Sequence, residues 1–166
     1  MMDNKERIEQ IIKIRNNDIE EQLRLCQEIL DNNPNDYETA SALLYKADAY
    51  LDYVRPEDAI KCGLEALNIA SSFGYQDIIM MIHNILGITF SLAGDVNSSI
   101  EHYIQALNEA QKYNNFVLVA AVYSNLTVLF MDNEDYDSAL EFCNKYWFYI
   151  QKIIYNEENV NEIWWR

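Results

Sequence analysis

The chain repeats itself at an interval of 40 residues, and this period constrains the fold more than any other feature of the sequence. The repeat is carried by small or short residues and by rings three positions later: Ala47, Gly87 and Thr127, then Tyr50, Phe90 and Phe130. Periods of about 20 to 50 residues are typical of arrays in which each copy packs on the next one. We therefore expect a stack of similar units.

Within each copy the apolar residues lie three and four positions apart, which predicts two helices joined by a turn. The first helices are expected at 37–53, 75–93 and 116–132, and the second helices at 56–72, 97–113 and 136–155. Only four glycines and two prolines occur in 166 residues, so a β architecture with many turns is disfavoured. Gly74 and Asn114 stand where a left-handed residue would end the second helices.

The repeat predicts one domain over residues 1–166. It would contain a partial or capping unit, three repeats and the truncated start of a further helix: 1–36, then 37–74, 75–114 and 115–155, then 156–166. The small residues are expected to let helix backbones approach closely, and the rings to fill the space one turn later. A helix in the middle of such a stack is apolar nearly all round, which explains the uncharged stretches 78–94 and 113–131 without a membrane.

Charge and cysteine content limit the partners and the compartment. The net charge is −15, which argues against nucleic acid or an anionic membrane as a partner, since both require a basic face. The three cysteines are widely spaced and contain no CxxC pair: Cys26, Cys62 and Cys143. A reducing, cytoplasmic environment is therefore expected.

The sequence offers no catalytic constellation, so it predicts neither an enzyme, nor a cofactor, nor a metal site. Its glycines are too far apart for a phosphate-binding loop, and no cysteine lies close to a histidine. His83 and His102 fall on different helices of one unit. Because Leu43 and Tyr123 take the place of His83 in the other units, a packed histidine is favoured over a ligand or a base.

The motif resembles the tetratricopeptide repeat, most clearly over Asn84–Phe90, Gly94-Asp95 and Ser99, Tyr103 and Ala106. The usual unit has about 34 residues, so the present units resemble the long-helix versions found in bacterial signalling proteins. The resemblance implies an all-α, right-handed α-solenoid of stacked antiparallel helix pairs. It also implies that first-helix residues line a concave groove that binds a peptide.

Carried onto this chain, the groove would use residues of the three first helices. These groove residues are Leu44, Asp48, Leu51, Asp52, Met81, Asn84, Ile88, Ser91, Ala121, Ser124, Asn125, Val128 and Met131. Apolar groups with side-chain amides suit a peptide, and Asp48 and Asp52 favour one with a basic end. None of these positions is basic, so the family's clamp for a C-terminal carboxylate is missing. Alternatively, the side-chain amides of Asn84 and Asn125 only form hydrogen bonds with neighbouring backbone groups or with water.

Aromatic residues gather near the end of the sequence: Trp147, Phe148, Tyr149, Trp164 and Trp165. They could form an interface with a following domain or with a second copy in a homo-oligomer. Ordinary packing between the last helices, or an improvised cap, is the alternative.

The sequence therefore predicts a non-enzymatic, protein- or peptide-binding scaffold. An alternative is an N-terminal sensory or regulatory domain of a larger bacterial signalling protein, such as a diguanylate cyclase, a kinase or a transcription regulator. Only the incomplete last repeat supports this alternative.

Overall fold

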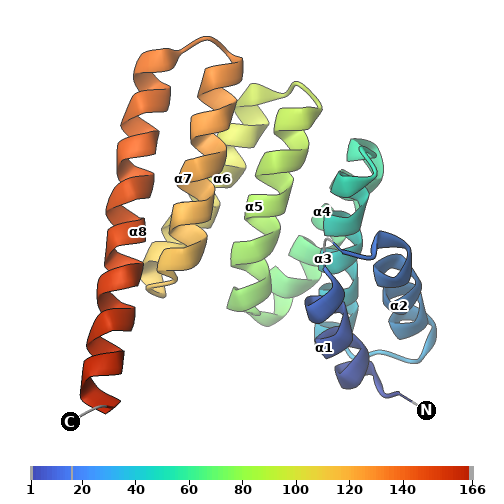
Figure 1. The fold of residues 1–166 in the computed structure, drawn as a ribbon. Coiled ribbons are helices and arrows are strands. Elements are labelled where there is room, and N and C mark those ends of the chain that lie inside the picture. Colours follow the sequence, from blue (N-terminus) through green and yellow to red (C-terminus); the bar gives the residue numbers. More distant parts are fainter. Residues whose placement is uncertain (1, 16, 165–166) are drawn as a thin grey trace. The chain divides into compact units, whose positions relative to one another are not determined.

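The computed structural model describes residues 2–15 and 17–164, with side chains described as far as Tyr155. The regular elements within these ranges are all α-helices (Figure 1). They are α1 (Asn4–Ile14), α2 (Ile19–Asp31), α3 (Asp36–Asp52), α4 (Pro56–Phe73), α5 (Gln76–Leu92), α6 (Val96–Lys112), α7 (Phe116–Asp132) and α8 (Tyr136–Trp164). The chain is thus all-α, as its sequence predicts.

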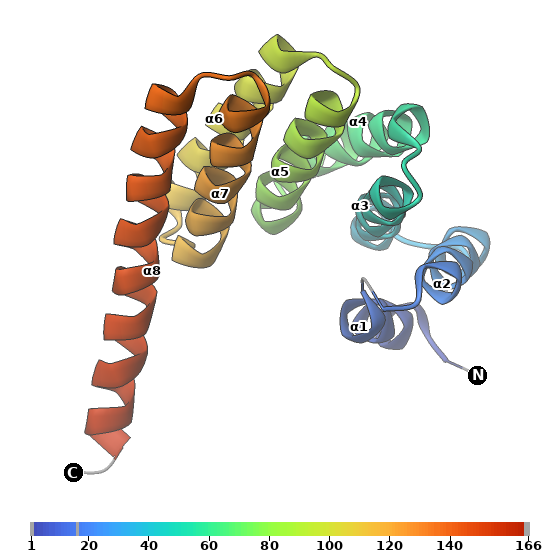
Figure 2. The same cartoon turned by 45° about the horizontal axis from the view of Figure 1, so that its top comes forward.

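Consecutive helices pack in antiparallel pairs, consistent with a helical repeat array. The helices fall into two units, Met1–His102 and Tyr103–Arg166, and the boundary lies within α6. In the first unit α3 packs against α2, α4 and α5, and in the second unit α7 packs against α8 (Figure 2). In the described part of the chain, no helix has the length and apolar character needed to cross a membrane.

The predicted helix positions are confirmed to within one residue, apart from the end of α8. The first helices of the repeats are α3, α5 and α7, and the second helices are α4, α6 and α8. This agreement follows from strong local signals. For example, Pro56 begins α4 with Glu57 and Asp58 in its first turn, where acidic groups favour the positive end of the helix dipole.

The 40-residue period is also present in the backbone conformation. Val54, Gly94 and Glu134, each in the turn within a repeat, have φ values of 53°, 80° and 61°. The N–H of the following residue donates to a carbonyl five residues earlier at 2.9 Å in all three turns: Arg55 to Tyr50, Asp95 to Phe90 and Asp135 to Phe130. One turn geometry therefore closes all three hairpins.

The predicted stop near residue 155 is wrong for the backbone, because α8 continues as one helix to Trp164. Gly74 and Asn114, which end the two earlier second helices, have φ values of 72° and 55°. The residue 40 positions after Asn114 is Ile154. Ile154 is neither glycine nor asparagine, the residues that adopt the left-handed conformation most readily, so the stop signal of the two earlier second helices is missing there.

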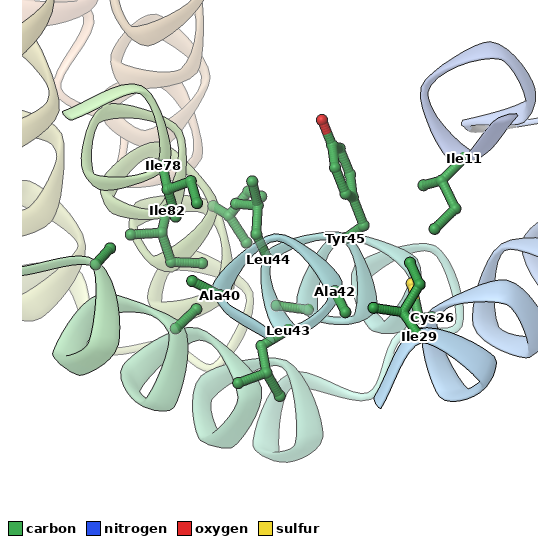
Figure 3. Packing of buried hydrophobic residues seen from close by; sticks show 14 of the residues in the cluster. Ile11, Cys26, Ile29, Ala40, Ala42, Leu43, Leu44, Tyr45, Ile78 and Ile82 are labelled. Carbon is green, nitrogen blue, oxygen red and sulfur yellow. The ribbon is translucent and has the colours of Figure 1, made fainter. Parts of the chain in front are cut away.

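The first unit has an extensive apolar core around α3 (Figure 3). Ala40, Leu44 and Ala47 are buried there, and Ile11 from α1 and Ile29 from α2 belong to the same cluster. α1 and α2 therefore form a helix pair that packs onto α3.

Small residues allow the predicted close approach of helices. Ser99 is fully buried, and its hydroxyl donates to the carbonyl of the buried Gly87 at 2.7 Å. A Cβ added to Gly63 of α4 would lie 2.7 Å from Leu86 Cδ2 of α5. Glycine is needed at position 63 because the neighbouring helix occupies that space.

The second unit is built on α7 and α8. Val119, Val122 and Leu126 are buried along α7, and the rings of Phe130 and Phe142 stack with centroids 5.2 Å apart. The packing therefore covers one face of α8.

Candidate binding surface

Two of the predicted groove residues, Leu44 and Asp48, belong to the interior of the first unit. Leu44 is 1% exposed and Asp48 is 7% exposed. The Asp48 carboxylate accepts from Arg15 Nε at 2.6 Å and from Arg15 Nη2 at 2.7 Å. Neither side chain is open to a ligand in this structure: Leu44 lies in the core, and Asp48 is covered by Arg15 at the end of α1.

The neighbouring acidic residue Asp52 is exposed, whereas Asp48 is buried. Partial desolvation raises the pKa of the Asp52 carboxyl group above the ordinary value, and the charge of Asp48 raises it further. Leu51 is partly buried and packs against the core. Asp48 and Asp52 therefore do not offer two open carboxylates to the basic end of a peptide.

The groove residues of α5 are partly buried: Met81, Asn84, Ile88 and Ser91. Met81 packs against the core of the first unit. Asn84 and Asn125 each already take part in an interaction of their own. This is compatible with the simpler alternative for the two amides, in which they satisfy neighbouring groups.

On α7 the predicted residues divide between two environments. Ser124 and Asn125 are partly buried, whereas Ala121, Val128 and Met131 are exposed. The predicted apolar contribution of α7 is therefore open to solvent at its second half.

The largest exposed apolar side chains of the second unit lie on α8. Trp147 is 57% exposed and Phe148 is 53% exposed, so packing on neighbouring rings covers each of these side chains only in part. We call the following exposed residues the α8 surface: Leu140, Trp147, Phe148, Ile154 and Tyr155. Their seven-residue spacing places Leu140, Trp147 and Ile154 in one row, with Phe148 and Tyr155 in the adjacent row. The side chain of Trp164 and all of Trp165 lie outside the described residues.

The face of α8 beside the α8 surface is less covered than the equivalent face of α4. Ala66 and Ala70 of α4 are fully buried in a core shared with α5, and Gly63 touches Leu86. The equivalent residues of α8 are larger and only partly buried: Cys143, Tyr146 and Ile150. The face that a following helix covers in the first unit is thus partly open on α8.

Beside this face, three rings surround the ammonium group of Lys152. Its Nζ lies 4.7 Å from the ring centroid of Phe148, 5.2 Å from that of Phe116 and 5.4 Å from that of Tyr149. A hollow of about 560 Å³ adjoins them, lined by Phe116, Phe148, Gln151, Lys152 and Tyr155. We call this hollow the ring pocket. Sequence reasoning singled out Phe148 but missed Phe116 and Lys152.

The two histidines meet in the first unit. His83 Nδ1 and His102 Nδ1 are 2.9 Å apart, and the ring of Phe90 stacks on His102 with centroids 5.3 Å apart. Burial, together with His102, lowers the pKa of His83 to about 4. The histidines are partly buried and packed, as expected for His83.

Two of the three cysteines are shielded, and the described part of the chain shows no cluster of metal-binding side chains. Burial raises the pKa of the Cys26 thiol to about 12, and it also raises that of Cys62, so both are poor nucleophiles at neutral pH. No set of three or more histidine, cysteine or carboxylate side chains with the geometry of a metal site occurs among the described residues.

Comparison of the chain with protein-family models and with curated proteins gives no match. The functional argument therefore depends on the α8 surface and the ring pocket themselves.

Proposed function

We propose that the protein is a non-enzymatic binding module that holds an apolar, basic helical segment of a partner protein against α8. The observation that carries this proposal is the exposure of Leu140, Trp147 and Ile154 in one row along α8. Contiguous exposed apolar side chains rimmed by polar groups are typical of protein interaction sites. Tryptophan is also among the residues that contribute most to binding energy.

A helix is the occupant that the repeat favours. In the first unit the face of α4 around Ala66 and Ala70 is covered by another helix, α5. The equivalent face of α8, formed by Cys143, Tyr146 and Ile150, is only partly buried. It adjoins the α8 surface, because Trp147 lies four residues after Cys143 and three before Ile150. A helix with apolar residues three and four positions apart would bury its own apolar stripe there.

Charge complementarity favours a basic partner. The whole chain carries a net charge of −15. Acidic side chains also lie at the end of α7, in the turn before α8 and in the first two turns of α8: Asp132, Glu134, Asp135, Asp137 and Glu141. Lysine or arginine at one end of the partner helix would meet this acidic end, and the attraction would accelerate association.

The resemblance to the tetratricopeptide repeat supports the same function, since that family binds peptides and protein segments. The antiparallel helix pairs and the repeated turns at Val54, Gly94 and Glu134 fit that family's architecture. We further propose a cytoplasmic location, which agrees with the three free cysteines.

A designed peptide tests the proposal directly. The probe is a fluorescent 15-residue helical peptide with leucines at helical spacing and lysines at one end, and a second peptide replaces each lysine by glutamate. Fluorescence anisotropy should give a dissociation constant at least about tenfold lower for the lysine peptide.

Trp147→Ala should weaken binding of the lysine peptide by about tenfold or more. Leu92→Ala is the matched control, because Leu92 is also 57% exposed but lies on α5 of the first unit. Equal affinity for the two peptides, or an unchanged affinity in Trp147→Ala, would contradict the proposal.

A further inference from the structure

The three rings around Lys152 are additions to the repeat rather than part of it. Phe116 stands where the other repeats have Asp36 and Gln76. Phe148 corresponds to Asn68 and Asn108, and Tyr149 corresponds to Ile69 and Glu109. Because the helix pairs of the other repeats form without rings at these positions, the hairpin itself does not require them.

The three added rings converge on one point in space although they come from two helices. Phe116 begins α7, whereas Phe148 and Tyr149 lie in the middle of α8. The Phe148 and Tyr149 rings meet edge to face at 5.4 Å, and Phe116 lies 5.9 Å from Tyr149. All three centroids lie within 5.4 Å of Lys152 Nζ. This is the arrangement by which aromatic faces bind an alkylammonium cation.

We propose that the ring pocket recognises an alkylammonium group, supplied by a lysine side chain of the partner helix, and that Lys152 is an internal occupant which the incoming group displaces. This inference rests on the proposed function and names the chemistry that one part of the α8 surface recognises. Aromatic ring faces carry negative electrostatic potential and attract a cation that has left water.

Displacement is feasible because of how Lys152 is held. It has a long flexible side chain, its contacts are with ring faces, and no ion pair fixes its ammonium among the described residues. The hollow of about 560 Å³ beside it is large enough for a second alkylammonium chain. Lys152 can therefore turn into solvent while the rings stay in place.

An anionic ligand fits the ring pocket less well. Of the residues that line the hollow, Lys152 alone is a cation, and its charge already faces the rings. Phosphate and carboxylate recognition usually requires several N–H donors or an arginine fork, and the lining is mostly aromatic. The chemistry of the lining thus favours a cation.

A matched pair of small probes tests the site. Choline carries a quaternary ammonium, and 3,3-dimethyl-1-butanol has the same shape without the charge. Binding is measured at constant ionic strength by titrating ¹⁵N-labelled protein and following amide shifts around Phe116 and Phe148. The wild-type chain should bind choline weakly, because Lys152 competes for the rings.

Lys152→Met should open the site, so its affinity for choline should rise about fivefold or more and exceed that for the neutral alcohol by a similar factor. Adding Phe148→Leu to Lys152→Met keeps an apolar side chain but removes one ring, and should reverse the gain. Lys145→Met is the matched control. Lys145 also lies over a ring, that of Phe142 at 5.0 Å, but it is not part of the ring pocket.

Equal binding of choline and the alcohol by Lys152→Met, or an equal gain in Lys145→Met, would overturn the site. A peptide arm identifies the source of the cation. A version of the helical probe with a further lysine at its other end can reach both the acidic start of α8 and the ring pocket. Replacing each lysine in turn by norleucine should weaken binding most at the end away from the acidic residues. If the peptide binds but no single lysine matters, the ring pocket is wrong and the proposed function stands. If choline binds as expected but the peptide does not, the proposed function fails and the cation site stands.

Discussion

Arg15 and Asp48 form a two-point ion pair that joins the end of α1 to the second half of α3. The guanidinium donates from Nε and Nη2 at 2.6 and 2.7 Å, and Gln22 Nε2 lies 3.5 Å from the same carboxylate. The hydrogen bonds from Arg15 are of the charge-assisted, forked kind that fixes geometry as well as adding energy. The carboxylate in turn raises the pKa of Arg15.

Asp48→Asn should therefore destabilise the first unit. It removes the charge that compensates Arg15 and weakens both hydrogen bonds, so we expect a loss of about 2–4 kcal/mol in the free energy of unfolding. Urea denaturation followed by circular dichroism measures it. Arg24→Gln is the control, because Arg24 pairs with Glu21 and Glu28 on the exposed side of α2, where water screens the charges, and should matter much less. Similar losses in the two variants would contradict a special role for the Arg15–Asp48 pair.

The repeated turns allow a test in which packing does not interfere. Val54 and Gly94 occupy equivalent left-handed positions, Val54 is 73% exposed, and nothing lies within 4 Å of a Cβ added to Gly94. Val54→Gly should relieve backbone strain and stabilise the protein by about 0.5–1 kcal/mol, after the extra entropy of glycine in the unfolded chain is included.

Gly94→Val should have the opposite effect, a loss of about 1–2 kcal/mol. Thermal unfolding of the two variants and of the wild-type chain provides the comparison. A higher melting temperature for Gly94→Val than for Val54→Gly would mean that φ at these turns is not the controlling variable.

The positions of the helices could be predicted from the sequence, because they depend on local signals and on the 40-residue period. Apart from the end of α8, helix ends could be located to one residue, because Pro56, Gly74 and Asn114 act within a few residues of their own position. The 40-residue spacing then transferred each assignment to the next repeat.

The sequence could not predict contacts that occur in only one place and are not repeated at the 40-residue period. Arg15 and Asp48 are 33 positions apart, and their pair is not repeated: Arg55 stands 40 positions after Arg15, but Ile88 stands 40 positions after Asp48. The sequence therefore leaves Asp48 open to a ligand. Phe116 was interpreted only as a residue near a helix start. A comparison of each repeat position with its equivalents would have singled it out, because polar residues stand at positions 36 and 76.

Gly63 tests the packing of α4 on α5. Valine at this position would bring its Cβ to 2.7 Å from Leu86 Cδ2 and 3.4 Å from Ile82 Cδ1, and its two methyl groups would need still more room. Gly63→Val should therefore destabilise the first unit by about 1–3 kcal/mol. In a protein that already carries Leu86→Ala, the same Gly63→Val substitution should cost less free energy of unfolding, because the smaller side chain leaves space for valine. No coupling between the two substitutions in a double-mutant cycle would argue against direct contact.

The His83–His102 pair makes stability depend on pH in a defined window. Burial and the neighbouring His102 lower the pKa of His83 to about 4, and burial also lowers that of His102, against the charge of Glu101. Both groups have an ordinary value of 6.5 in the unfolded chain. Below pH 6.5 the unfolded chain therefore binds protons that the folded chain does not. The contribution is complete above pH 6.5 and is lost as the pH falls towards 4.

Folding stability should thus decrease by about 2 kcal/mol between pH 7 and pH 4 on account of this pair, beyond the change caused by the carboxylates. The double variant His83→Leu/His102→Phe isolates that part, because leucine stands at the equivalent position 43 and phenylalanine at position 142. Urea denaturation at a series of pH values should give a flatter profile for the variant over this window, with the two curves parallel above pH 7. Parallel curves throughout would mean that protonation of the pair is not linked to unfolding.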